Sequence, residues 1–117
     1  MPTFRQGDVV KVPFPYTDRP TRQYRPALVV SAGNNEEALG LLWVVMITSA
    51  ANRGWPGDVP VGDLDAAGLP VPSLVRTAKI ATIEAADATK LGRLSAGQIK
   101  QVTRRLAREL GLAAGAT

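Results

Sequence analysis

The most apolar stretch of the chain runs from Leu41 to Ile47, and it constrains the fold more than any other feature. It follows Gly40 and ends at the hydroxyl pair Thr48-Ser49. A short apolar run with such ends is typical of a fully buried strand, and it is far too short to cross a membrane as a helix. The sequence therefore predicts a sheet in which this segment is the central strand.

Shorter apolar runs separated by Gly, Pro and Asn predict further strands. The turn Gly7-Asp8 leads into a strand over residues 9–14, in which alternate side chains share one apolar face. Gly33 and the two asparagines after it predict a hairpin turn over residues 33–37. The remaining predicted strands cover residues 27–31, 59–61, 73–83 and 91–94. The segment 73–83 is expected to be either one long strand or two strands with a bulge. Residues 59–61 are expected at an edge, because Pro60 cannot donate to a ladder.

One helix is predicted, beginning at Ser95 and stopping before Gly111. Ser95 and Gln98 have the spacing of a capping box. An apolar stripe at helical spacing is expected to pack on the core, formed by Ile99, Val102, Leu106 and Leu110. The tail 112–117 is expected to fray. Residues 1–117 are thus predicted to form one domain, a small and mostly antiparallel barrel capped by a C-terminal helix.

Two residue types are missing from the chain, and their absence narrows its chemistry. There is no cysteine and no histidine, which excludes disulfides, thiol nucleophiles and imidazole acid–base catalysis. The ten carboxylates are scattered, so neither a metal site nor a cofactor is expected. Catalysis would have to use Arg, Lys, Ser, Thr, Tyr or a lone carboxylate. Because the N-terminus has no signal-peptide core, a cytoplasmic location is expected.

The charge balance is basic, with 14 Lys and Arg against 10 Asp and Glu, a net charge of +4. Positive charge favours a polyanionic partner, because phosphate contacts supply most nonspecific nucleic-acid affinity. A net charge of this size could also serve only to keep the protein soluble. The distribution of the charges along the chain therefore has to decide between solubility and a polyanionic partner. Arg19 and Arg22 lie in the predicted loop 15–24 and Arg25 directly follows it, so the three form a cluster, whereas the arginines of the C-terminal helix are interpreted as a solvated face.

Tyr16 and Tyr24 flank that basic loop. Aromatic rings among arginines suit stacking on unpaired RNA bases, and packing at the base of the loop is the alternative for each ring. A second predicted loop, residues 50–57, carries Arg53 and Trp55. These two loops are the candidate edges of a nucleic-acid groove.

Arg25 precedes Pro26, and the residue before a proline is held in an extended conformation. Its guanidinium is therefore predicted to leave the rim of the sheet beside the basic loop, with Pro26 first in the strand. The alternative is a surface arginine that pairs with Asp18 or Asp8. The hydroxyl of Thr48, at the end of the central strand, either bonds the chain locally or faces a ligand. If the two strands are neighbours, Arg25 and Thr48 converge.

Six motifs occur in a fixed order over residues 6–110: Gly7-Asp8-Val9-Val10 with Pro13-Phe14, Arg25-Pro26, Ile47-Thr48-Ser49, Gly68-Leu69 with Ser73-Leu74-Val75, the segment 79–83, and Gly92-Arg93-Leu94-Ser95. In this order they resemble the MazF/PemK family of toxin endoribonucleases. The resemblance implies an SH3-like barrel, a homodimer, metal-independent cleavage of single-stranded RNA, and inhibition by a cognate antitoxin peptide.

The resemblance places the catalytic residues at Arg25 and Thr48. Its chemistry is attack by the RNA 2′-OH on phosphorus, with Arg25 stabilising charge on the phosphoryl oxygens. The chain departs from the family at Ala78 and Ala81, where relatives carry polar groove residues, and Lys79 and Arg76 are expected to supply the basic contact. RNA contacts are expected from Tyr16, Arg19, Arg22, Tyr24, Ser49, Arg53, Trp55, Ser73, Arg76 and Lys79.

Two other functions are compatible with the same barrel. The first is RNA binding without catalysis, with Arg25 only a phosphate anchor. The second is gyrase poisoning by a toxin of shared fold, which depends on a C-terminal aromatic residue. This chain ends in Ala113-Ala114-Gly115-Ala116-Thr117, which disfavours the second alternative.

Overall fold

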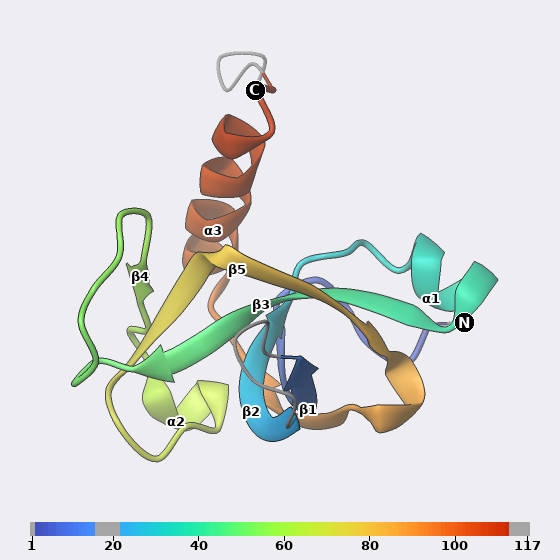
Figure 1. Ribbon diagram of the computed structural model, residues 1–117, viewed down its shortest axis with the longest axis horizontal. Coiled ribbons are helices and arrows are strands. Elements are labelled where there is room, and N and C mark those ends of the chain that lie inside the picture. Colours follow the sequence, from blue (N-terminus) through green and yellow to red (C-terminus); the bar gives the residue numbers. More distant parts are fainter. Residues whose placement is uncertain (1, 16–21, 113–117) are drawn as a thin grey trace.

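The computed structural model describes residues 2–15 and 22–112 (Figure 1). In this part of the chain, six strands form one sheet in the order β4-β5-β3-β2-β1-β6, and every neighbouring pair is antiparallel. The sheet curls into a half-barrel, and a C-terminal helix projects from it (Figure 1). The predicted fold class, mostly antiparallel β with a C-terminal helix, is confirmed. The strands are β1 Asp8–Pro15, β2 Arg22–Val29, β3 Leu41–Ser49, β4 Val59–Pro60, β5 Ser73–Glu84 and β6 Thr89–Arg93.

Strand β3 lies inside the sheet, as its apolar sequence predicts. It pairs with β2 on one side and with β5 along its whole length on the other. The β3–β5 register shifts once, because Val45 pairs with Ile80 whereas the next residue, Met46, pairs with Arg76. Residues 77–79 therefore bulge from the ladder, which bends β5. The predicted long, bulged strand and the predicted edge strand at Pro60 are both present.

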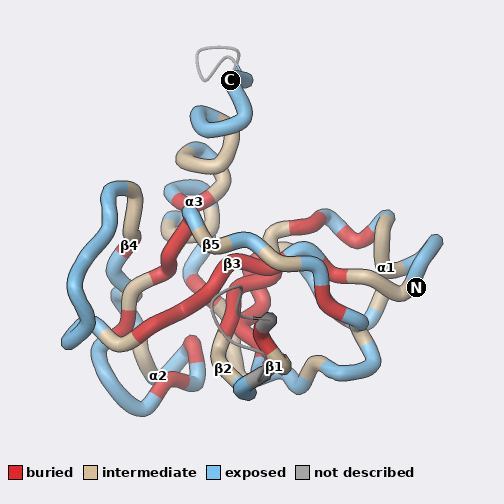
Figure 2. The backbone as a smooth tube through the Cα atoms, in the orientation of Figure 1, coloured by how far each residue is buried: buried red, intermediate tan, exposed pale blue. Residues whose placement is uncertain are grey.

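Each face of the sheet carries its own apolar cluster, because side chains alternate along a strand. Val44 and Met46 belong to one cluster, and Val45 and Ile47 belong to the other. The second cluster is covered by α2 Leu64–Ala67 and α3 Ala96–Glu109, which contributes the fully buried Val102. Figure 2 shows buried residues concentrated along β3 and at the base of α3. Burial of each such branched side chain stabilises the fold by about 1.5–3 kcal/mol.

Helix α3 begins where the sequence predicts. The Ser95 hydroxyl oxygen accepts a hydrogen bond from the Gln98 backbone N–H at 3.3 Å, and Gly111 has the positive φ of a helix stop. The second half of the predicted capping box is replaced by a tertiary contact, because the Gln98 side chain bonds the backbone of Pro60 and Gly62. The predicted stripe is wrong at its end, since Leu110 is 72% exposed where the helix extends past the sheet.

Two other local predictions are wrong. Residues 33–37 do not form a hairpin turn; they belong to α1 Asn34–Leu39, which lies between the positive-φ residues Gly33 and Gly40. The Glu36 carboxylate accepts from the backbone N–H groups of Thr3 and Phe4, which ties the N-terminal segment to α1. This long-range contact stabilises a helix that local turn signals do not predict.

The second error concerns the start of β2. Pro26 is not the first residue of the strand, because β2 begins at Arg22 and Arg25 pairs with Val12 of β1. The β3 ladder reaches only Ala27, so Pro26 stands outside that ladder and its missing N–H is tolerated. Arg25 is therefore held within a two-stranded extension of the sheet rather than on a loop.

Candidate functional site

The register between β2 and β3 bears on how the two predicted catalytic positions are placed. Ala27 pairs with Met46, Leu28 with Val45 and Val29 with Val44. The ladder ends at the Ala27–Met46 pair; continued by two residues, the same register would place Arg25 across from Thr48. Opposed residues of antiparallel strands project from the same face, so the two side chains share the face of Ala27 and Met46. The pairing therefore supports a common face for the two side chains, whereas their contact and their catalytic role remain predictions.

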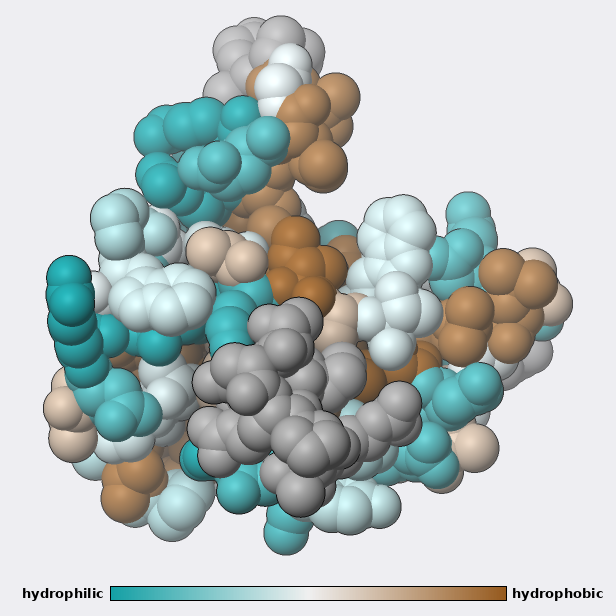
Figure 3. Space-filling view, viewed as in Figure 1, coloured by the Kyte–Doolittle hydropathy of each residue, from teal (hydrophilic) through white to brown (hydrophobic). Residues whose placement is uncertain are grey.

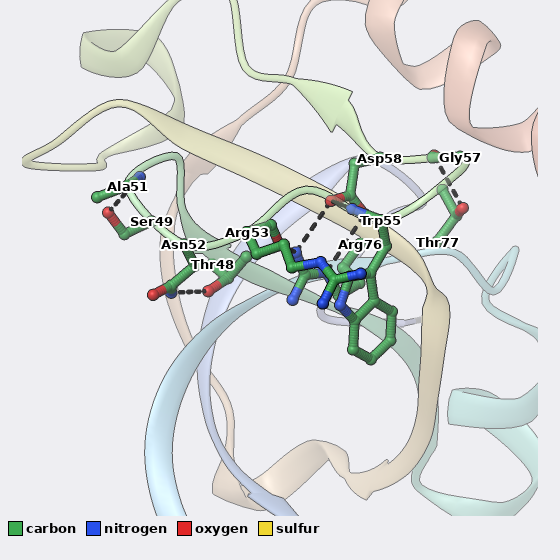
Figure 4. A network of polar contacts seen from close by, with 10 residues as sticks. All are labelled: Thr48, Ser49, Ala51, Asn52, Arg53, Trp55, Gly57, Asp58, Arg76 and Thr77. Atoms are coloured by element: carbon green, nitrogen blue, oxygen red, sulfur yellow. Dashed lines mark hydrogen bonds and ion pairs between the residues drawn. The ribbon is translucent and has the colours of Figure 1, made fainter.

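The two residues differ in exposure and in their hydrogen bonds. Arg25 is half-buried, and its Nη2 donates to Gln23 Oε1 at 3.2 Å. Thr48 is only 5% exposed, and its Oγ1 accepts from Asn52 Nδ2 at 2.7 Å (Figure 4). Because an amide N–H occupies a lone pair of that oxygen, the hydroxyl hydrogen of Thr48 is directed elsewhere. The arrangement combines a planar cation with an oriented hydroxyl donor.

Asn52 was missed by the sequence reasoning. The pattern Thr-x-x-x-Asn spans the turn after β3, where the Asn52 N–H also donates to the Ser49 carbonyl at 3.0 Å. An asparagine four residues beyond a strand-terminal threonine was the available signal. It was weak, because asparagine is common in turns for local reasons.

Arg76 is the centre of a buried network beside this pair. Its Nε and Nη2 donate to the two carboxylate oxygens of Asp58 at 3.3 and 3.0 Å, and Nη2 also reaches the Arg53 carbonyl at 2.7 Å. The side chains of Arg76 and Asp58 are 8% and 7% exposed. This predicted RNA-binding residue is thus engaged inside the protein, where it fixes the segment 53–58 to β5 (Figure 4).

Trp55 lies over the same network. The Arg76 Cζ atom is 4.2 Å from the centre of the indole ring, and Lys79 Nζ is 5.9 Å from it. The backbone N–H of Trp55 donates to Asp58 Oδ2 at 2.8 Å, and the residue is 40% exposed. A tryptophan held by a cation and still open to solvent can stack on a further planar group.

The other predicted contact residues are placed less uniformly. Ser73 is buried and donates to the Val71 carbonyl, and the Ser49 Oγ accepts from the Ala51 N–H, so both hydroxyls make local bonds. Tyr24 is 63% exposed on β2, and Arg53 is exposed in the turn. Tyr16, Arg19 and Asp18 lie outside the described residues, and of Arg22 only the backbone is described.

Asp8, the other partner considered for Arg25, is buried and lies 3.0 Å from Arg93 Nη1 and 3.5 Å from Lys90 Nζ. Across residues 2–15 and 22–112, no three acidic side chains gather as a metal site would require. None of the helices in that part of the chain is long and apolar enough to cross a membrane.

Comparisons with known proteins bear on the family and the fold of the chain. Residues 5–110 match the family described as PemK-like, MazF-like toxin of type II toxin-antitoxin system. No curated protein sequence gives a significant match.

Several solved structures share the fold. MazF from Deinococcus radiodurans (Form-I) is 23% identical with a TM-score of 0.76, covering 93% of this chain and 97% of its own. The MazE–MazF complex of the same organism (Form-II) is 23% identical with a TM-score of 0.71, covering 94% and 97%. An endoribonuclease from Mycobacterial species, in complex with its cognate antitoxin, is 22% identical with a TM-score of 0.72, covering 97% and 98%.

Proposed function

The chain belongs to the PemK-like, MazF-like toxins of type II toxin–antitoxin systems, and on this basis we propose that it is a metal-independent endoribonuclease. Its substrate in this proposal is single-stranded RNA in the cytoplasm, chiefly mRNA, and its action arrests translation and growth. The observation that carries the proposal is the β2–β3 pairing, which ends two residues short of Arg25 and Thr48 and directs both side chains to one face, with Asn52 bound to Thr48.

The proposed reaction needs no group beyond the RNA, solvent water and these side chains. The ribose 2′-OH attacks the adjacent phosphorus, the bond from phosphorus to the 5′-oxygen breaks, and the products are a 2′,3′-cyclic phosphate and a 5′-OH. Arg25 donates two N–H groups to the phosphoryl oxygens, where negative charge grows. Thr48 donates its hydroxyl hydrogen to the same phosphate. Arginine stays protonated in proteins, so it is no general base. Water accepts the 2′ proton, and water also supplies the proton that converts the departing 5′-oxygen into the 5′-OH.

Asn52 and Trp55 have supporting roles in this proposal. Asn52 holds Thr48 Oγ1 from one side, which aims the hydroxyl at the substrate, so it is a positioning residue. Trp55 offers an exposed ring on which an unpaired base stacks, and Arg76 supports the ring from within. Arg76 and Asp58 therefore shape the RNA surface without touching the RNA.

The proposed regulator is a cognate antitoxin with an acidic, apolar C-terminal tail. Two of the similar structures are complexes of a related toxin with its antitoxin. A tail that crosses the Arg25 region neutralises the cation that RNA phosphates require, so the two ligands compete.

We also propose that the protein is a homodimer. A hollow of about 830 Å³ lies between α3 and the β3–β5 face, and several large apolar side chains around it are exposed. They are Trp43, Ile80, Leu110 and Leu112. Figure 3 shows the matching hydrophobic surface along one side of α3 and down toward β5. Ile80→Glu should yield a monomer in sedimentation analysis if this face joins the subunits.

The deciding experiment incubates purified protein with single-stranded RNA in excess EDTA and identifies the new ends. Cleavage with 5′-OH ends, lost in Arg25→Ala, is the expected result. Cleavage abolished by chelation, or 5′-phosphate ends, contradicts the mechanism. RNA that is bound but never cut supports the non-catalytic alternative.

A further inference from the structure

A basic hollow of about 370 Å³ lies between α3 and residues 57–59, apart from the Arg25 site. Four cationic side chains line it: Lys100, Arg104, Arg105 and Arg108. Its lining contains one carboxylate, Asp58, which already accepts from Arg76 and from the Trp55 N–H. The hollow therefore carries a large excess of positive charge.

Three of these cations, Lys100, Arg104 and Arg108, follow one another at intervals of four residues on α3. We call them the basic row. In the part of the chain that the structure describes, no ion pair involves any of the three. Like charges at this spacing repel one another and weaken the helix. A polyanion laid along α3 relieves that repulsion.

Arg105 differs from the basic row because the protein itself holds it. Its Nη2 pairs with Glu109 at 3.2 Å, and its guanidinium lies directly beneath Gly57. A Cβ at Gly57 would stand 2.7 Å from Arg105 Nε, and Gly57 has a φ of +89°, so only glycine fits there. This contact fixes the turn against α3 and leaves the basic row as the free cationic wall of the hollow.

The segment 53–58 links the hollow to the proposed RNA surface, because Asp58 lines the hollow and Trp55 belongs to that surface. The Asp58 carboxylate holds the Arg76 and Trp55 network, while the same residue lines the hollow. Figure 4 shows the network running from Thr48 and Asn52 at one end to Gly57 beside α3 at the other. Figure 3 shows a hydrophilic side of α3 opposite its hydrophobic side.

From this juxtaposition we propose that the basic row binds the phosphates of the RNA strand that flanks the cleavage site. The inference rests on the proposed endoribonuclease function and extends its substrate to a longer single strand. Four residues of α-helix rise about 6 Å, which is comparable to the spacing of phosphates on an extended strand. The row gives affinity without reading bases, because phosphate contacts carry no direct sequence information.

The test compares a short RNA containing only the cleaved motif with a long RNA that has flanks on both sides. Both carry a 2′-deoxy substitution at the scissile nucleotide, so that binding is measured without cleavage. The variants are Arg104→Gln/Arg108→Gln and, as a matched loss of two charges elsewhere, Arg5→Gln/Lys11→Gln, whose side chains are exposed. Circular dichroism verifies that each variant is folded.

The wild type should bind the long RNA at least tenfold more tightly than the short one at low salt. Arg104→Gln/Arg108→Gln should abolish most of that advantage, and the slope of log K against log salt for the long RNA should fall by about 1.4, or 0.7 per lost phosphate contact. Binding of the short RNA should be unchanged. The control variant should retain the advantage of the long RNA.

Three results overturn the inference while the wild type still binds the short RNA. They are an unchanged slope in Arg104→Gln/Arg108→Gln, an equal loss in the control variant, and a loss of antitoxin-peptide affinity without loss of RNA affinity. If the wild type binds neither RNA, the proposed function itself fails, and this inference fails with it.

Discussion

Asp58→Ala is the most direct test of the network that supports the candidate site. The substitution removes the acceptor of two Arg76 hydrogen bonds, at 3.0 and 3.3 Å, and of the Trp55 N–H at 2.8 Å. The Arg76 side chain is only 8% exposed, so its charge remains buried without a carboxylate. Breaking a buried ion pair from one side typically costs 3–5 kcal/mol.

Two contacts that survive the substitution reduce this cost. Arg76 retains the Arg53 carbonyl at 2.7 Å and the Trp55 ring at 4.2 Å. We therefore expect the free energy of unfolding to fall by about 3 kcal/mol, near the lower end of that range. The measurement is urea unfolding followed by Trp fluorescence, which also reports the environment of Trp55.

The matched control is Asp65→Ala, an exposed carboxylate in α2 whose loss should change stability by less than about 0.5 kcal/mol. A double substitution, Asp58→Leu with Arg76→Met, should recover much of the loss, because it leaves no unpaired charge. If Asp58→Ala costs less than about 1 kcal/mol, the Arg76–Asp58 pair does not anchor the turn. RNA affinity should fall with stability in Asp58→Ala, because the Trp55 backbone loses its hydrogen bond to Asp58.

Three further outcomes are expected. Arg25→Ala should lower the rate of RNA cleavage about a hundredfold or more without unfolding the protein. Arg25→Lys should also cleave RNA slowly, because an ammonium group cannot donate two parallel hydrogen bonds as a guanidinium does. A fully active Arg25→Ala enzyme would show that the catalytic site lies elsewhere. Asn52→Ala should lower the cleavage rate less than Thr48→Val does and leave RNA affinity nearly unchanged, whereas equal losses in rate and affinity would contradict a positioning role.

The third outcome concerns the pH dependence of stability. Partial burial acts to raise the pKa of Glu36, but hydrogen bonds from the Phe4 and Thr3 N–H groups outweigh it and lower that pKa below its ordinary value of 4.5. A carboxyl group whose pKa is lower in the folded state than in the unfolded state stabilises the fold when the pH is above its unfolded-state pKa. This stabilisation is lost as the pH falls through the folded-state pKa. The stability gap between wild type and Glu36→Gln should therefore narrow below about pH 4.5, and a gap that is independent of pH would contradict this.

The sequence predicts the sheet well because strand signals are local. The apolar run 41–47, the Pro60 edge and the long segment 73–83 all appear as strands at the expected places. Errors arise where distant contacts compete with local preference. Residues 33–37 carry turn signals, yet the bonds from Thr3 and Phe4 to Glu36 join them to a segment some thirty residues away. A sequence pattern contains no such information.

The candidate site shows the same division more sharply. Arg25 and Thr48 could be proposed in advance because each stands beside an apolar run, and the pairing of those two runs as β2 and β3 supports a common face for them. The roles of Asn52 and Asp58 could not, because each depends on a partner whose position only the folded chain determines. The same reasoning explains Arg76: its sequence suggests an RNA contact, whereas Asp58, Arg53 and Trp55 enclose its guanidinium. Positive charge on a strand thus predicts a ligand only when no carboxylate folds onto it.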